Sequence, residues 1–145
     1  MILFVCTGNT CRSPMAEALL RKKLADNNIH KEVKSAGVAA YEPTASYGSI
    51  NAMKNYGVDI MNHIPTLVTK ELVQKADLIL TMTNTHKHNI IKKYEGVNDK
   101  IFALKEYVHG TDEDVMDPFG GSIEIYMSTA KELKDLIDNL SIDKL

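Results

Sequence analysis

Cysteine is scarce in this sequence: among its 145 residues only Cys6 and Cys11 are cysteines, and both lie near the N-terminus. A structural disulfide framework would use more cysteines and distribute them over the chain. In a reducing cytoplasm both side chains are expected to be thiols. A chain of ordinary domain size needs no disulfide to stabilise its fold, so two closely spaced thiols indicate a chemical role for cysteine rather than a structural one.

Long apolar stretches and an excess of one charge are also missing. No apolar run approaches the roughly 20 residues of a membrane-spanning helix, and residues 1–5 are too short and uncharged to be a secretory signal. The 17 basic and 19 acidic residues nearly cancel, which gives no electrostatic case for nucleic acid or an anionic membrane as a partner. We therefore expect a cytoplasmic protein, and the sequence indicates no particular oligomeric state.

Apolar segments alternate with amphipathic ones along the whole chain. Strands are predicted at residues 2–5, 31–35 (as an edge strand), 77–82 and 101–104, and helices from Ser13-Pro14 onward, at 45–56, 69–76 and 84–93, and from Tyr126 to Leu140. This alternation predicts an α/β fold, a single three-layer domain over residues 1–145 whose doubly wound, four-stranded parallel sheet carries helices on both faces. Residues 105–121 are predicted to form a long loop rich in Asp, Glu and Gly.

The first predicted strand runs into the segment CTGNTCRS at residues 6–13. A strand, a tight loop and a helix N-terminus in succession point backbone N–H groups at a bound anion. Ser13 is expected to cap the helix, with Pro14 as its first residue. Arg12 can hold two phosphate oxygens with its planar guanidinium. Cys6 is then a nucleophile whose thiol pKa should be lowered by the helix N-terminus and by Arg12.

Other uses of these residues fit less well. The phosphate loop of nucleotide hydrolases needs Gly-Lys-Ser/Thr, which is missing here. A zinc site at Cys6 and Cys11 lacks a matching pair of further ligands. An inert buried thiol beside a surface arginine would leave the order of strand, loop and helix unexplained. Phosphate-ester or phosphate-amide cleavage through a phospho-cysteine, without a metal or other cofactor, is the predicted chemistry.

Such a phosphatase also needs an acid for the leaving group. Asp117 is the candidate, because Pro118 restricts its backbone and Phe119 follows, just before the Gly120-Gly121 bend. Nearby Asp112, Glu113 and Asp114 are rival acids, which we expect to belong to a solvated acidic loop.

Residues in this order resemble the low-molecular-weight protein tyrosine phosphatases, from the Cys-x5-Arg-Ser loop to the Asp-Pro loop before the last helix. The resemblance implies that Cys6 is the nucleophile, Arg12 the phosphate clamp, and Asp117 the general acid and then the general base. It also implies that the loop residues Thr7, Gly8, Asn9, Thr10 and Cys11 hold the phosphate, with support from Ser13, Ser35 and His63.

Further roles are implied by the same resemblance. Tyr41 and Phe119 would form the walls of the substrate slot. Cys11 would be a redox partner that forms a reversible disulfide with the nucleophile. The remaining histidines that we compared, His86, His88 and His109, match nothing in the family and are expected to face solvent.

Within this family the sequence is most similar to the bacterial protein-arginine phosphatases, which share a loop Thr and Asp-Pro-Phe-Gly-Gly. Phosphorylated proteins are the expected substrates, with phosphoarginine preferred and phosphotyrosine as the alternative. We expect the Thr10 hydroxyl to hydrogen-bond Asp117 beside a guanidinium leaving group. An arsenate reductase would need further redox cysteines, and none follows Cys11. A silent phosphoprotein reader would not need Cys6, Arg12 and Asp117 together.

Overall fold

Four parallel strands form one sheet in the computed structural model, which describes residues 1–145. In spatial order they are β2 (Val33–Gly37), β1 (Ile2–Cys6), β3 (Leu78–Thr81) and β4 (Ile101–Ala103). Phe4 of β1 lies opposite Ser35 on one side and Leu80 on the other, and β3 pairs with β4 in the same sense. The predicted four-stranded parallel sheet is confirmed, with β2 at an edge.

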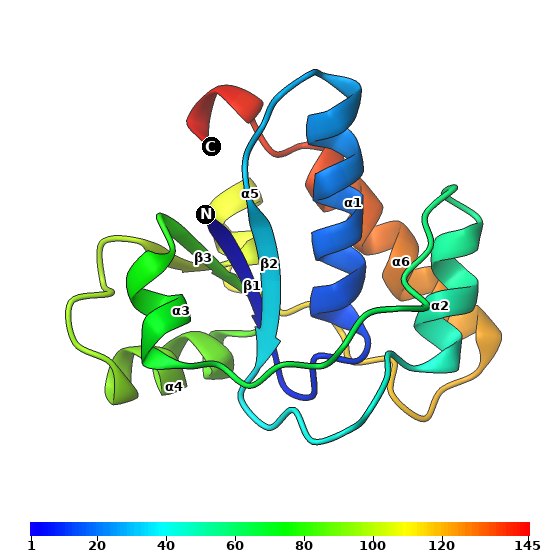
Figure 1. Ribbon diagram of the computed structural model, residues 1–145, viewed down its shortest axis with the longest axis horizontal. Helices are drawn as coiled ribbons and strands as arrows, with labels where there is room; N and C mark the ends of the chain where they lie inside the picture. The colour runs from blue at the N-terminus through cyan, green and yellow to red at the C-terminus, as the bar shows by residue number, and fades with distance from the viewer.

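Helices cover both faces of this sheet and complete three layers, as Figure 1 shows. One face carries α1 (Arg12–Asp26), α2 (Tyr47–Lys54) and α6 (Ile123–Asp138), and the other carries α3 (Lys70–Lys75) and α4 (Asn84–Lys93). Two short elements, α5 (Leu104–His109) and the 3-10 turn η1 (Ile142–Lys144), complete the chain. The doubly wound three-layer architecture is therefore as predicted.

Local capping explains where several helices begin. A hydroxyl side chain just before the helix accepts a hydrogen bond from a backbone N–H of the first turn at Ser46, Thr69, Thr83 and Ser122. Each cap satisfies one of the N–H groups that a helix N-terminus leaves without a partner. The Thr83 cap places the start of α4 at Asn84, and the helix spans residues 84–93 as the sequence predicted.

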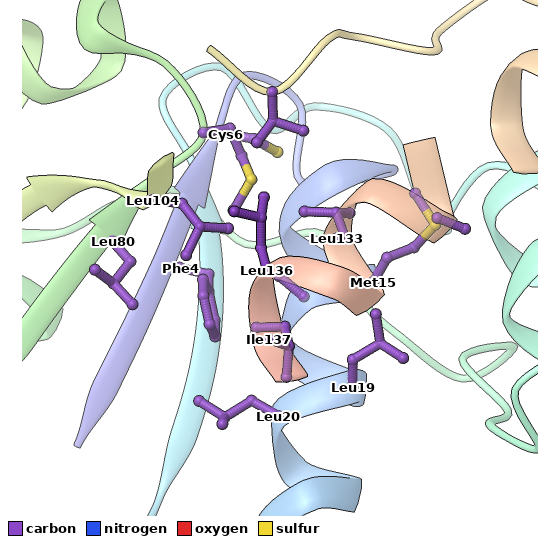
Figure 2. Packing of buried hydrophobic residues seen from close by; sticks show 14 of the residues in the cluster. Phe4, Cys6, Met15, Leu19, Leu20, Leu80, Leu104, Leu133, Leu136 and Ile137 are labelled. Carbon is purple, nitrogen blue, oxygen red and sulfur yellow. The ribbon is translucent and has the colours of Figure 1, made fainter. Parts of the chain in front are cut away.

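Strand β1 divides the core in two. Ile2, Phe4 and Cys6 face a cluster built with α1 and α6, whereas Leu3 and Val5 face the smaller cluster of α3 and α4. This alternation follows from the period of two along a strand, and it explains why a central strand is apolar throughout. Figure 2 shows Phe4 and Cys6 against side chains of α1 and α6. Cys6 is thus held by the core at the end of a rigid strand.

Residues 105–121 are not one long loop, which corrects the sequence prediction. Leu104, expected at the end of a strand, is instead the first residue of α5. The Glu106 carboxylate accepts a hydrogen bond from Ala103 N at 3.0 Å and pairs with Lys87 at 3.0 Å, and Gly110 ends the helix at φ 70°. A helix of six residues fixed by contacts of this kind leaves little periodic signal in the sequence.

The chain order places a binding crevice at the end of β1. The connections from β1 lead to β2 on one side and onward to β3 on the other, which makes the carboxyl edge of β1 the switch point of the sheet. Gly37 ends β2 beside it, where a Cβ would lie 2.9 Å from Asn9 N and closer still to Thr7 O. Glycine at this position therefore lets the loop after Cys6 pack directly onto the sheet.

Candidate active site

Residues 7–11 wrap around the sulfur of Cys6. Asn9 adopts the left-handed conformation at φ 55°, and its backbone N–H donates to Cys6 Sγ at 3.3 Å. Asn tolerates this conformation better than most residues because its short polar side chain can hydrogen-bond locally. The loop leads directly into the N-terminus of α1, where N–H groups and the helix dipole favour an anion.

Ser13 is not the cap of α1, contrary to the prediction. The helix begins at Arg12, and Cys11 occupies the N-cap position without a side-chain hydrogen bond. Since it does not cap the helix, the Ser13 side chain can make another contact: its Oγ lies 2.8 Å from Cys6 Sγ. Pro14 is still tolerated, because the first helical turn needs no N–H from it. Ser13 therefore faces the candidate nucleophile rather than the helix backbone.

Asn9 joins the predicted supporting residues into one buried network. Its side-chain nitrogen donates to Ser13 Oγ at 2.8 Å and to Ser35 Oγ at 2.9 Å. Its side-chain oxygen accepts from Thr66 N at 2.9 Å and lies 3.1 Å from His63 Nε2. Ser35 and His63 thus come together at the loop, as the resemblance implied.

The network ends at Glu17, a residue that sequence reasoning missed. Ser35 Oγ donates to a Glu17 carboxylate oxygen at 2.5 Å, and Arg21 pairs with Glu17 at 2.7 Å. His63 Nδ1 lies 4.0 Å from the same carboxylate. Glu17 is only 8% exposed, and a buried carboxylate without partners would be costly. Its place one helical turn after Ser13 was the available signal, since both lie on the buried face of α1.

The pKa of Cys6 departs from the prediction. Burial raises the pKa of the Cys6 thiol above its ordinary value, because Sγ is withdrawn from water. The Ser13 hydrogen bonds, the Arg12 charge and the Asn9 N–H all act to lower it, but burial outweighs them. The expected lowering is therefore wrong in direction, although each group that was expected to cause it is in contact with the sulfur or near it.

Arg12 and Asp117 meet at the mouth of this loop. The Arg12 guanidinium is nearly buried and donates from Nη1 to Val115 O at 3.0 Å, while its Nη2 lies 3.6 Å from Asp117 Oδ2. The other Asp117 oxygen accepts from Phe119 N at 3.1 Å. Arg12 is thus anchored by backbone on one side and faces a half-exposed carboxylate on the other.

These residues line a common cavity of about 210 Å³. Its walls contain residues of the predicted loop, two residues of the segment that carries Asp117 (the acid loop) and two residues that the sequence did not single out, Ala39 and Glu42. The full set is Cys6, Thr7, Gly8, Thr10, Cys11, Arg12, Ala39, Glu42, Asp117 and Phe119. Tyr41 is not among them and is 79% exposed. The expectation that Tyr41 forms a wall of the slot is not met in this structure, and Glu42 lines that side instead.

Two expectations for the loop side chains also need correction or refinement. Thr10 does not hydrogen-bond Asp117; its Oγ1 lies 3.5 Å from Cys11 Sγ. Cys11 is a free thiol, as is Cys6, and its sulfur lies 3.1 Å from Ser46 Oγ and 3.5 Å from the Tyr126 hydroxyl. The predicted redox role of Cys11 stays a prediction.

The acidic loop and the histidines separate into distinct groups. Asp112 and Asp114 contact Asn84 at the start of α4, and Glu113 is exposed, so none of the rival acids lines the cavity. His88 and His109 face solvent as expected.

His86 corrects that expectation, because it is 5% exposed and its Nε2 lies 2.8 Å from Thr7 Oγ1. Its position on α4 gave no local signal of this contact.

No group of three or more His, Cys, Asp or Glu side chains is arranged to hold a metal ion. None of the helices combines the length and apolar character that a bilayer crossing requires.

The family model for low molecular weight phosphotyrosine protein phosphatase matches residues 1–145. The chain belongs to this family. The predicted resemblance is thereby confirmed, and the chain is a hydrolase of the phosphatase class.

Individual relatives agree over nearly the whole length. A protein named protein-arginine-phosphatase from Geobacillus stearothermophilus is 47% identical over 97% of this chain and 93% of its own. A low molecular weight protein tyrosine phosphatase from T. tengcongensis superposes with a TM-score of 0.94 at 46% identity, covering 99% of this chain and 98% of its own. A mutant of the YwlE arginine phosphatase with a phosphorylated active-site serine superposes with a TM-score of 0.91 at 43% identity, covering 95% and 91%.

Proposed function

We propose that this protein dephosphorylates protein side chains through a phospho-cysteine at Cys6, with phosphoarginine as the preferred substrate. The observation that carries the proposal is the shared cavity in which Cys6, Arg12 and Asp117 meet beneath a loop at a helix N-terminus. The YwlE mutant with a phosphorylated active-site serine supports a covalent phospho-enzyme intermediate. We also propose that the protein works in the cytoplasm, without a nucleic-acid or membrane partner.

In the first step Cys6 Sγ, as the thiolate, attacks phosphorus and the bond from phosphorus to the leaving atom breaks. Asp117 delivers a proton to that atom, because the leaving groups are poor, with pKa values of ~10 for tyrosine and above ~12 for arginine. Loop N–H groups and the Arg12 guanidinium stabilise the equatorial oxygens, as preorganised donors do in other active sites. No metal is required for this charge stabilisation.

In the second step a water molecule attacks the phosphorus of the phospho-cysteine. Asp117, now ionised, accepts a proton from that water, and the Cys6 thiolate leaves. Hydrogen bonds from Ser13 and from Asn9 N stabilise the departing sulfur. The reacting sulfur is anionic at both ends of the cycle, and burial raises the pKa of Cys6. The rate is therefore expected to rise with pH on the acid side of the profile.

Two features of the cavity favour phosphoarginine. Its walls include the carboxylates of Glu42 and Asp117, and Thr10 stands where Ile or Leu would add apolar bulk for a phenyl ring. A phosphorylated guanidinium keeps a positive charge next to the phosphate, whereas the phenyl ring of phosphotyrosine is neutral. The relative named protein-arginine-phosphatase supports the same preference.

Phosphotyrosine is the second candidate substrate. The ring of Phe119 lines the cavity and is 68% exposed, which offers a surface against which a phenyl group can stack. The T. tengcongensis protein supports this alternative by its name. Activity on both substrates is compatible with one mechanism, so the ratio of kcat/KM decides the preference.

The test of specificity compares matched phosphoarginine and phosphotyrosine peptides. Thr10→Ile should shift the kcat/KM ratio toward phosphotyrosine by roughly tenfold to a hundredfold, as expected for ~1–3 kcal/mol at a polar wall. Glu42→Gln should lower the rate on phosphoarginine about fivefold, as expected for ~1 kcal/mol of charge attraction. Glu113→Gln, an exposed control outside the cavity, should change neither rate. A wild-type ratio that favours phosphotyrosine would reject the preference.

The covalent step has its own test. Cys6→Ser should abolish turnover but still bind inorganic phosphate, and acid quenching of the wild-type protein during turnover should trap a phosphorylated Cys6. Turnover by Cys6→Ser at the wild-type rate would reject the mechanism.

A further inference from the structure

The first turn of α4 touches both halves of the candidate active site. Thr83 caps this helix by accepting from His86 N at 3.1 Å. From the same turn, His86 contacts Thr7 of the loop at residues 6–13, here called the phosphate loop. Asn84 contacts Asp114 of the segment at residues 111–121 that carries Asp117, the acid loop. These two loops come from segments far apart in the sequence. Helix α4 lies between them in chain order and packs against β3 and β4.

The contact with the phosphate loop is well defined. His86 Nε2 lies 2.8 Å from Thr7 Oγ1, and Thr7 lines the cavity immediately after Cys6. The His86 ring is 5% exposed, and its Nδ1 has no hydrogen-bond partner within the protein. Desolvation and the nearby Arg12 charge lower the pKa of His86 to about 4, although Asp114 and Asp117 oppose this. His86 is therefore a neutral ring with a single polar contact.

The contact with the acid loop is made by Asn84. Its backbone N–H donates to Asp114 Oδ1 at 2.8 Å, and its side-chain nitrogen donates to Asp112 O at 3.1 Å and Asp112 Oδ1 at 3.0 Å. The next residue of this loop, Val115, donates from its backbone N–H to Met82 O at 2.9 Å, just before the helix. Asp117 follows Val115 by two residues, so these bonds fix the position of the backbone that leads to Asp117.

We propose that the first turn of α4 is a brace that holds the phosphate loop and the acid loop at a set separation, with His86 and Asn84 as positioning residues. His86 acts through Thr7 on the loop that binds phosphate. Asn84 acts through Asp112 and Asp114 on the loop that carries Asp117. The inference rests on the proposed roles of the Cys6 loop and of Asp117. It predicts that loss of the His86 contact weakens phosphate binding, and that loss of the Asn84 contacts lowers kcat for substrates with poor leaving groups.

The His86 side is tested by phosphate binding, which needs no turnover. Replacing His86 with Leu removes the contact with Thr7, and the dissociation constant of inorganic phosphate, measured by calorimetry, should rise about three- to tenfold, the value of one neutral hydrogen bond. His86→Gln keeps a polar atom near the position of Nε2 and should restore binding to within about twofold of the wild-type value. His88→Leu, an exposed histidine on the same helix, is the control and should bind as the wild type does.

Stability separates positioning from a merely structural role. The exposed Thr7 hydroxyl can bond to water in His86→Leu, and the buried unpartnered Nδ1 is removed. The thermal midpoint of this variant should therefore not fall while its phosphate binding weakens. A lowered midpoint with unchanged phosphate binding would overturn the role of His86.

The Asn84 side is tested by the leaving group. Asn84→Ala removes the two side-chain bonds to Asp112 and keeps the backbone bond to Asp114. The loss of the Asp112 bonds should reduce kcat about three- to tenfold for substrates with poor leaving groups, and much less for aryl phosphates with good ones, with phosphate binding unchanged. Asn89→Ala, an exposed asparagine on the same helix, is the control. An equal reduction for all leaving groups, or none, would overturn the role of Asn84.

Comparison with Asp117→Ala keeps the two proposals apart. If Asp117→Ala shows the leaving-group effect and Asn84→Ala does not, the brace is rejected and the proposed function stands. If Asp117→Ala shows none, the acid assignment is rejected. The phosphate-binding result for His86 decides its half of the brace in either case.

Discussion

Arg12 Nη2 lies 3.6 Å from Asp117 Oδ2, and the two side chains differ sharply in exposure, at 5% for Arg12 and 51% for Asp117. This spacing is longer than a normal hydrogen bond, so the pair brings the carboxylate over the cavity without locking it there. An incoming phosphate can take the place of the carboxylate at Nη2. Asp117 would then be free to face the leaving group at the cavity mouth.

Asp117→Ala should therefore act on the chemical step and not on phosphate binding. We expect kcat to fall about 10²- to 10⁴-fold for phosphoarginine and alkyl or phenyl phosphates, the usual loss when a general acid is removed. Aryl phosphates with activated leaving groups should be affected far less. Binding of inorganic phosphate should stay equal or become tighter, since a negative charge near Arg12 is lost. A uniform loss over all leaving groups would contradict the assignment.

Ser13→Ala should move the pH profile of kcat/KM to higher pH. The Ser13 hydrogen bonds lower the pKa of Cys6 and partly offset its burial, so removing the hydroxyl raises that pKa further. Below the pKa the thiolate fraction falls, and a hydrogen bond to a charged group of ~1.5–3 kcal/mol corresponds to a loss of roughly tenfold or more in rate. The measurement is kcat/KM with an activated aryl phosphate over pH, together with thiolate absorbance. A shift of the acid limb to lower pH would contradict the argument.

Gly37→Ala should damage the phosphate loop from the side of the sheet. Its Cβ would lie 2.9 Å from Asn9 N, and backbone atoms cannot move aside as a flexible side chain can. We expect a loss of about 1–3 kcal/mol in the free energy of unfolding, as for other overpacked sites, together with weaker phosphate binding. Gly57→Ala is the control, because Gly57 at φ 70° has no neighbour for a Cβ and does not line the cavity. That variant should lose stability while retaining phosphate binding.

His86 should make the folded state sensitive to mild acid. Its pKa is lowered to about 4 from an ordinary value of 6.5, so the unfolded state binds a proton first as the pH falls. Above pH 6.5 the group is neutral in both states and does not affect stability, whereas between 6.5 and 4 the free energy of unfolding falls, by as much as about 3 kcal/mol. Denaturant unfolding of wild type and His86→Gln at several pH values isolates this loss. Parallel curves for the two proteins between these pH values would contradict it.

Much of the fold and part of the site could be predicted from local patterns. The apolar run of β1 and the residues of α4 follow from periodicity and capping, which act within a few residues. Cys6 and Arg12 share one loop, so their proximity is almost a local property. The short helix α5 was missed because contacts of Glu106 with Lys87 and with Ala103 N support it, and the first of these comes from another element.

What the sequence by itself determined is the order of strand, loop and helix at Cys6 and Arg12, because covalent connection and local backbone preference act over short distances. Only the tertiary structure decided that Asp117 faces Arg12 rather than Thr10, that Glu42 and not Tyr41 lines the cavity, and that His86 is buried against Thr7. It also decided the direction of the Cys6 pKa, since the loss of water around a sulfur depends on every segment that packs over it.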